Sequence, residues 1–169
     1  MKQLQLAGRL TPLGLAAAIA ACAIDQATKL WLIFGFELGR RGDVAIAPFV
    51  DFVLTWNTGI SYGWFKQEGP LGQWTLTAFK IVAVALLLIW LARATSRLSA
   101  ISLGLIIGGA LGNAIDRLIH GAVADFVLLH TPQWSFHWYV FNFADVTIVA
   151  GVLGILYESV IGERAAKAP

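Results

Sequence analysis

The sequence contains few charged residues for its length. Charged side chains make up 13% of its 169 residues, about half the share that is usual in a soluble domain. Hydrophobic residues make up 58%, and the mean hydropathy is +0.73. These values exclude an ordinary soluble domain and predict one integral membrane domain over residues 1–169. The formal net charge of +2 is too small to indicate binding to nucleic acid.

Cysteine and the common metal and hydrolase motifs are scarce as well. Cys22 is the single cysteine, so no disulfide can form within the chain and no multi-cysteine metal site is available. The histidines His120, His130 and His137 lack a close ligand spacing, and there is no HExxH motif. No serine lies in a GxSxG motif. We therefore expect no metal and no cofactor.

Four apolar runs are each long enough to cross a hydrocarbon core of about 30 Å as a helix. The predicted spans are residues 13–34, 71–91, 99–119 and 138–161. The first run begins like a removable leader peptide, but it stays apolar past Cys22 as far as Phe34, which favours a retained span. Gly104, Gly108 and Gly112 in the third run form a small-residue stripe that predicts close helix packing.

Two of the predicted spans carry charged residues. Asp25 and Lys29 are four residues apart in the first span, which places them on one helical face, and we interpret them as a structural ion pair. Lys80 in the second span is interpreted as a side chain that extends to the membrane interface.

The segment of residues 35–70 is mixed in composition and is predicted to form a small cap outside the membrane. Phe49–Leu54 is rich in β-forming residues and predicts short strands, and Asn57–Gly59 predicts a turn. We hypothesise that Arg40–Phe65 moves as a lid, because it contains several glycines.

Basic residues predict the orientation of the chain. An even number of spans puts both termini on one side, where short segments contain Lys2, Arg9, Arg93, Arg97, Arg164 and Lys167. The other side has fewer basic residues, which are spread over longer loops: Arg40, Arg41, Lys66 and Arg117. The positive-inside rule then favours cytoplasmic termini and an external cap.

Two aspartates in apolar surroundings are the main candidates for chemistry. Asp125 follows the third span and Asp145 lies in the fourth. A carboxylate in hydrocarbon is costly, so its default interpretation is functional. A facing pair would share one proton, with one member as acid and the other as base. This is what a metal-free intramembrane aspartyl protease requires.

Polar residues near the same membrane face could hold a peptide backbone. Asn113 and Arg117 share a face of the third helix with Asp116, and Asn142 is three residues before Asp145. With Asn57, these groups either hydrogen-bond a substrate or bond each other and helix ends.

Five sequence blocks together resemble the bacterial lipoprotein signal peptidases, signal peptidase II. The blocks are Asp25–Lys29, Asn57–Gly59, Gly108–Arg117, Gly121–Phe126 and Phe141–Asp145. One departure is Ile60-Ser61-Tyr62, where the family often has Ala-Ala-Phe.

The resemblance implies an all-α membrane protein of four transmembrane helices with a small extracytoplasmic β-cradle and a periplasmic helix. It also implies a multi-pass enzyme of the bacterial inner membrane, with its active site towards the periplasm. The implied reaction removes the signal peptide from a diacylglyceryl-modified prolipoprotein, just before the lipid-modified cysteine. Membrane lipid is the implied surrounding.

The resemblance assigns roles to ten residues. Asp125 and Asp145 match the catalytic dyad. Positions that contact the substrate or the inhibitor globomycin are matched by Asn57, Gly59, Asn113, Arg117 and Asn142. Structural support is assigned to Asp25, Lys29 and Asp116.

Two other classes of protein remain as alternatives from the residues alone. A small transporter or channel could use Asp25, Lys29 and Asp145 as a relay, although the sequence shows neither repeat symmetry nor broken helices. A structural membrane subunit would not need the two aspartates.

Overall fold

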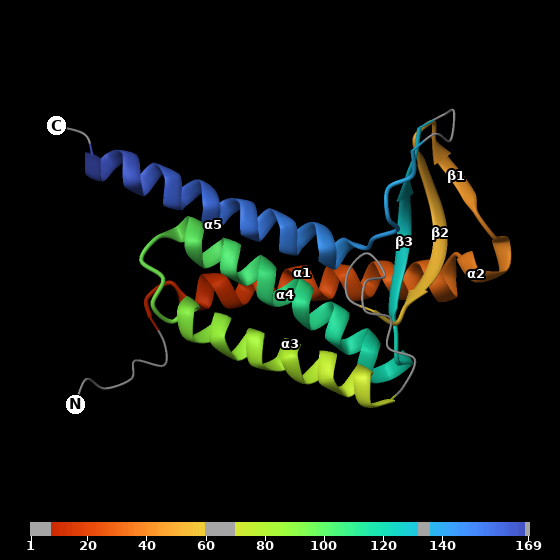
Figure 1. The fold of residues 1–169 in the computed structure, drawn as a ribbon, viewed down its shortest axis with the longest axis horizontal. Helices are drawn as coiled ribbons and strands as arrows, with labels where there is room; N and C mark the ends of the chain where they lie inside the picture. The colour runs from red at the N-terminus through yellow and green to blue at the C-terminus, as the bar shows by residue number, and fades with distance from the viewer. Residues whose placement is uncertain (1–7, 60–69, 132–135, 168–169) are drawn as a thin grey trace.

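The computed structural model describes residues 8–59, 70–131 and 136–167. Its long helices run side by side, and a small sheet lies at one end, while both termini lie at the other (Figure 1). Helix α1 (Thr11–Leu30) continues as a π-helix, η1 (Trp31–Gly35), and is followed by α3 (Pro70–Leu91), α4 (Arg97–His120) and α5 (Phe143–Lys167).

Three helices in the described part of the chain are long and apolar enough to cross a membrane, namely Thr11–Gly35, Arg97–His120 and Phe143–Val160. A shorter apolar stretch, Ala78–Leu91, lies in α3. The chain is therefore a mostly helical, multi-pass membrane protein.

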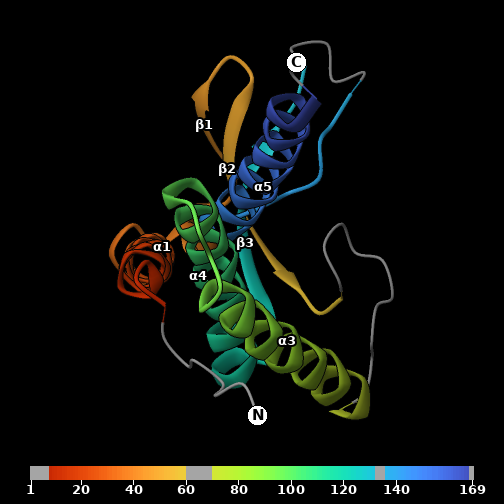
Figure 2. The same ribbon diagram turned by 90° about the vertical axis from the view of Figure 1, so that its left-hand side faces the viewer.

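Helix α4 is the central element of the bundle, between α1, α3 and α5 (Figure 2). Gly104 and Gly108 face α1, where an added Cβ would collide with backbone oxygens of that helix. Where α4 meets α5, a Cβ added at Gly109 of α4 or at Gly151 of α5 would likewise collide with a backbone oxygen of the other helix. The small residues let the backbones approach closely, as the glycine stripe predicts.

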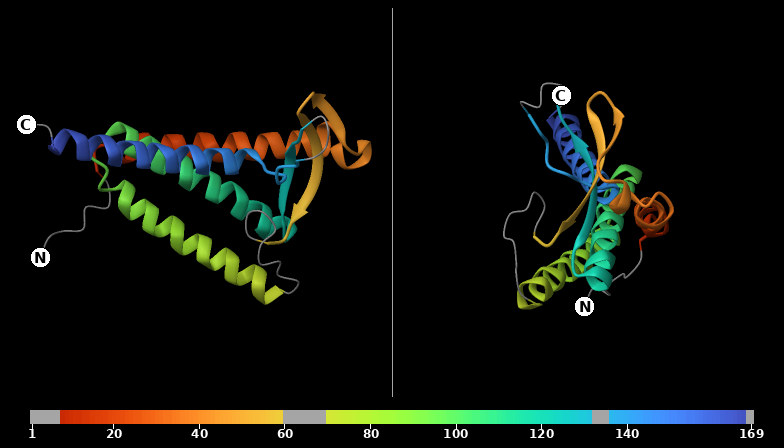
Figure 3. Two further views of the ribbon diagram at one scale, coloured as in Figure 1. Left: turned by 45° about the horizontal axis from the view of Figure 1, so that its top comes forward. Right: turned by 90° about the vertical axis from the view of Figure 1, so that its right-hand side faces the viewer.

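The apolar core lies between α1, α3 and α4. Leu91, Leu103 and Ile107 are almost fully buried there, together with Ala18 and Val84. Towards the sheet, the N-terminal end of α3 leans away from α1 and α5 (Figure 3).

The sheet is antiparallel and has three strands in the order β1-β2-β3. Strand β1 is Val44–Ala47, β2 is Val50–Asn57 and β3 is Val123–Leu129. Gly121, at φ 72°, ends α4 and turns the chain into β3. Pairing of β2 with β3 places Asn57 opposite Val123, so the end of β2 lies next to the start of β3. The sheet confirms the strands predicted for the cap.

A short helix, α2 (Leu38–Arg41), connects η1 to β1. Residues 60–69 lie outside the described residues, and with them the last part of the predicted cap and the final six residues of the hypothetical lid.

Helix α5 begins at Phe143, five residues later than the predicted start at residue 138. The backbone before it bonds to β3 instead: Trp138 N donates to Leu129 O at 2.7 Å, and Phe141 N donates to Val127 O at 3.0 Å. Apolar composition alone does not separate such an extended stretch from the helix that follows it.

Candidate active site

Asp125 lies on β3 and is 3% exposed. Both of its carboxylate oxygens accept hydrogen bonds from side-chain amides. Asn57 Nδ2 donates to Oδ2 at 3.0 Å, and Asn142 Nδ2 donates to Oδ1 at 2.6 Å. The strand pairing explains the first contact, because it sets the end of β2 beside Asp125.

Asp145 lies in the first turn of α5, where Asn142 caps the helix. Asp145 N donates to Asn142 Oδ1 at 3.1 Å, and Asn142 N donates back to Asp145 Oδ2 at 3.2 Å. This reciprocal arrangement is a capping box. The positive end of the helix dipole favours a negative charge on Asp145.

Asn142 therefore connects the two aspartates. Its amide nitrogen bonds Asp125, while its amide oxygen and backbone nitrogen bond Asp145. The two carboxyl groups, 20 positions apart in the sequence, come together around one side chain.

Asn113 on α4 holds Asp145 from the other side. Its Nδ2 donates to Asp145 Oδ1 at 3.1 Å. Its Oδ1 accepts from Asn142 Nδ2 and from Lys29 Nζ, each at 3.1 Å. Two donors on the amide oxygen fix the orientation of the amide, so that its nitrogen must face Asp145.

Beneath this layer lies a buried ion cluster. Lys29 Nζ is 2.8 Å from Asp25 Oδ2 and 2.8 Å from Asp116 Oδ2. Gln26 Nε2 donates to Asp116 Oδ1 at 2.9 Å. A Cβ at Gly112 would be 2.5 Å from Asp25 Oδ2, so the last glycine of the stripe makes room for this carboxylate.

The two carboxylates of the cluster also bond the segments that carry the candidate dyad. Asp25 Oδ1 accepts from Ala144 N at 2.9 Å, next to Asp145. Asp116 Oδ2 accepts from Ala124 N at 3.1 Å, next to Asp125. The cluster thus fixes the start of α5 and the start of β3 relative to α1 and α4.

Arg117 connects α4 to the end of β2. Its Nη2 donates to Gly59 O at 2.6 Å, and Gly59 N donates to Asn57 Oδ1 at 2.9 Å. All ten residues singled out in the sequence therefore belong to one hydrogen-bonded network. Gln26 also belongs to it. It lies in the block Asp25–Lys29, but no role was predicted for it from the sequence.

Burial is the main influence on the charge of Asp125. It raises the pKa of this carboxyl to about 6, and the nearby charge of Asp145 acts in the same direction. The amide hydrogens of Asn57 and Asn142 act in the opposite direction. Asp125 therefore keeps its proton to a higher pH than an exposed aspartate does. Among the described residues, no three His, Cys, Asp or Glu side chains gather as they would around a metal ion.

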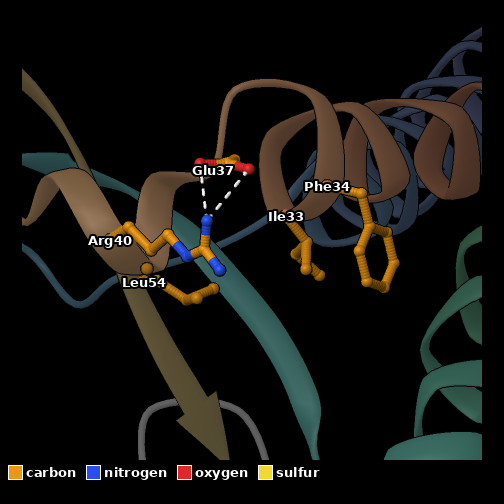
Figure 4. A pocket seen from close by; sticks show the side chains of 6 residues that line it. Ile33, Phe34, Glu37, Arg40 and Leu54 are labelled. Carbon is orange, nitrogen blue, oxygen red and sulfur yellow. Dashed lines mark hydrogen bonds and ion pairs between the residues drawn. The ribbon is translucent and has the colours of Figure 1, made fainter.

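A separate pocket of about 220 Å³ opens where η1 and α2 meet β2. Its lining residues are Ile33, Phe34, Glu37, Gly39, Arg40 and Leu54 (Figure 4). Arg40 Nη1 is 3.3 Å from Glu37 Oε2. None of the ten candidate residues lines this pocket, so it is distinct from the network.

Comparison with known structures supports the fold. A bacterial membrane enzyme solved by the in meso method at 2.3 Å resolution superimposes with a TM-score of 0.73 at 23% identity, over 93% of this chain and 92% of that one. A second such structure, at 1.9 Å resolution, gives a TM-score of 0.68.

Comparison of sequences gives the family. A model of the family described as signal peptidase (SPase) II matches residues 17–161. The lipoprotein signal peptidase of Rhodopseudomonas palustris is 60% identical over 159 residues, which are 93% of this chain and 97% of that protein. The lipoprotein signal peptidase of Nitrobacter hamburgensis is 58% identical over 164 residues, which are 95% of this chain and 100% of its own. The chain, in which Asn142 bridges Asp125 and Asp145 by hydrogen bonds, therefore belongs to the signal peptidase II family.

Proposed function

We propose that this protein removes signal peptides from prolipoproteins by hydrolysing the peptide bond just before the diacylglyceryl-modified cysteine. Asp125 and Asp145 are the catalytic dyad of this proposal. The observation that carries it is the bridge through Asn142, which holds two carboxyl groups from β3 and α5 around one amide. The family of the chain supports the substrate class.

The two environments suggest which aspartate is the acid. Asp125, with its raised pKa of about 6, holds the shared proton, and Asp145 at the helix N-terminus is the base. Asp145 takes a proton from the attacking water while Asp125 gives its proton to the scissile carbonyl oxygen, which forms a neutral gem-diol. When the carbon–nitrogen bond breaks, Asp145 returns its proton to the leaving nitrogen, and a hydroxyl proton goes back to Asp125.

The surrounding polar groups are proposed to bind the substrate backbone, and to bind an inhibitor of the globomycin type. These residues are Asn57, Gly59, Asn113, Arg117 and Asn142. Each amide or guanidinium group now bonds a neighbour within the network, and substrate carbonyls would replace part of these bonds. In an apolar site each such hydrogen bond is favoured, because an unpaired polar group costs about 1–3 kcal/mol.

We also infer that α3 is a fourth span and that both termini are cytoplasmic. Pro70–Leu91 has 22 residues, enough to cross the hydrocarbon core. The start of α1 and the loop between α3 and α4 lie at the end of the bundle opposite the sheet (Figure 1). Arg9, Arg93 and Arg97 lie in or next to these segments, as the positive-inside rule requires for the cytoplasmic side. The sheet and the site then face the periplasm, where the family resemblance also predicts a further helix.

The test is cleavage of a diacylated precursor by purified Asp125→Asn and Asp145→Asn variants, followed by gel shift. Both variants should lose turnover completely, since neither member alone serves as acid and base. Asp43→Asn, at an exposed position just before β1, is the matched control and should cleave normally. Thermal unfolding in detergent checks that each variant is folded. Near-normal turnover of either dyad variant would refute the assignment.

A further inference from the structure

Lys80 lies in the middle of α3, away from both ends of the helix. It is ten residues from Pro70 and eleven from Leu91, or about 15 Å from either end at a rise of 1.5 Å per residue. A four-carbon side chain is too short to reach either end of the helix from that position. Lys80 is therefore not near an end of α3, which the sequence-based interpretation of an interfacial side chain assumed.

The face of α3 that carries Lys80 is directed into the bundle. Val84 and Leu91, four and eleven residues further along, lie on the same face and are 9% and 0% exposed. The flanking residues Phe79 and Ile81 are 72% and 59% exposed and face the lipid. Lys80 itself is half-buried, so its ammonium is directed towards the protein interior.

Charged groups on α1, α4, α5 and β3 act on Lys80. Asp145 on α5 and Asp125 on β3 attract its ammonium, whereas Arg117 on α4 and Lys29 on α1 repel it. Lys29 is already held by two carboxylates, and Arg117 bonds the backbone at Gly59. Val84, one turn from Lys80 on the same face of α3, packs in one cluster with Ile107 of α4. Lys80, one turn nearer the sheet, therefore lies at the level of α4 that carries Asn113, the side chain that donates to Asp145.

Among the described residues of the region, the formal charges balance only when Lys80 is included. The four carboxylates and three cations are Asp25, Asp116, Asp125 and Asp145 with Lys29, Arg117 and Lys80. Their sum is minus one, and the single proton shared by the dyad brings it to zero. Without Lys80 the same dyad would leave an uncompensated negative charge in a low-dielectric interior, which is unfavourable.

We propose that Lys80 is the counter-ion of the singly ionised aspartate pair and sets the pH range in which the enzyme is active. It is a positioning residue that acts on the dyad through space, and the inference rests on the proposed function of Asp125 and Asp145. A nearby cation stabilises the ionised form of a carboxyl group. Removing it should make the pair gain protons at higher pH.

The test is the pH dependence of kcat/KM on the diacylated precursor for wild type, Lys80→Met and Lys80→Arg. In Lys80→Met both limbs of the profile should move to higher pH, by about one pH unit. Lys80→Arg keeps the charge and should leave both limbs in place. Phe79→Met, on the lipid-facing side of the same turn, controls for a disturbed helix and should also leave the limbs unchanged.

The outcomes separate this inference from the proposed function. If Lys80→Met does not fold, Lys80→Gln is the second neutral variant and carries the same expectation. A folded neutral variant with the wild-type profile would refute the counter-ion role while Asp125→Asn and Asp145→Asn remain inactive. Turnover by Asp125→Asn or Asp145→Asn would instead refute the proposed function.

Discussion

Asn142 combines a structural role and a site role in one side chain. Its Oδ1 caps α5 by accepting from Asp145 N, and its Nδ2 donates to Asp125. A serine at this position keeps an oxygen for the cap but has no amide for Asp125, so the two roles can be separated by substitution.

We predict that Asn142→Ser keeps most of the stability, while Asn142→Ala loses about 1 kcal/mol because the cap is removed. Cleavage of the diacylated precursor should fall strongly in both, because both lose the 2.6 Å bond from Asn142 Nδ2 to Asp125 Oδ1. Thermal unfolding and initial cleavage rates measure the two effects. Wild-type cleavage by Asn142→Ser would show that the amide donor is dispensable.

The raised pKa of Asp125 predicts how stability depends on pH. Its folded-state pKa, about 6, is above the ordinary value of 3.8, so its protonated form favours the folded state. This contribution is fully present below about pH 3.8 and is lost as pH rises through about 6. Two pKa units correspond to about 3 kcal/mol.

Asp125→Asn should lack this pH dependence. The unfolding free energy of wild type minus that of Asp125→Asn should therefore fall as the pH rises from about 4 to about 7. This range spans the unfolded-state and folded-state pKa values of Asp125. Unfolding in detergent at a series of pH values measures it. A difference that stays constant across the range would show that Asp125 does not titrate as its burial indicates.

At the scale of the elements, the contact between α1 and α4 depends on glycine. The backbone oxygen of Ala18 lies where a Cβ of Gly108 would be. We predict that Gly108→Ala forces the helices apart and lowers stability by about 1–3 kcal/mol, measured by thermal unfolding. The control is Gly39→Ala on α2, where the Cβ would meet only the end of the Leu54 side chain at 3.3 Å. Equal stability of the two variants would contradict the close approach.

Different elements were predictable from the sequence to different degrees. The glycine stripe of α4 could be predicted because its spacing is local. The start of α5 could not, because residues 138–141 are as apolar as a span and their pairing with β3 is a long-range contact. The spacing of Asn142 and Asp145 is nonetheless that of a capping box, a local signal for the true start.

In the candidate site, too, some features could be predicted from the local sequence and others depend on long-range contacts. Asp125 and Asp145 stand out because a carboxylate is rare in apolar sequence. Their connection through Asn142, and the inward direction of the α3 face that carries Lys80, depend on how strands and helices pack, which no local spacing encodes.

At the scale of the whole molecule, the sheet and the loop between α3 and α4 lie at opposite ends of the bundle (Figure 1). The proposed topology predicts that a cysteine at Asp43 reacts with a membrane-impermeant maleimide added from the periplasmic side. A cysteine at Arg93 should react only after the membrane is permeabilised. Both positions are exposed.

The experiment uses a Cys22→Ser background, because Cys22 is the single native thiol. The cysteine-free protein is the control and should remain unlabelled on both sides. Labelling of the Arg93 position from the periplasm, with the Asp43 position protected, would reverse the orientation.

The ion pair of α1 has a consequence for biosynthesis. Lys29 and Asp25 are on the same helix, four residues apart, whereas Asp116 leaves the ribosome 87 residues after Lys29. The first helix therefore carries its own neutralising partner when the translocon releases it into lipid. The later arrival of α4 adds a second carboxylate to a lysine that has already entered the bilayer, so the order of synthesis matches the order in which these charges can be buried.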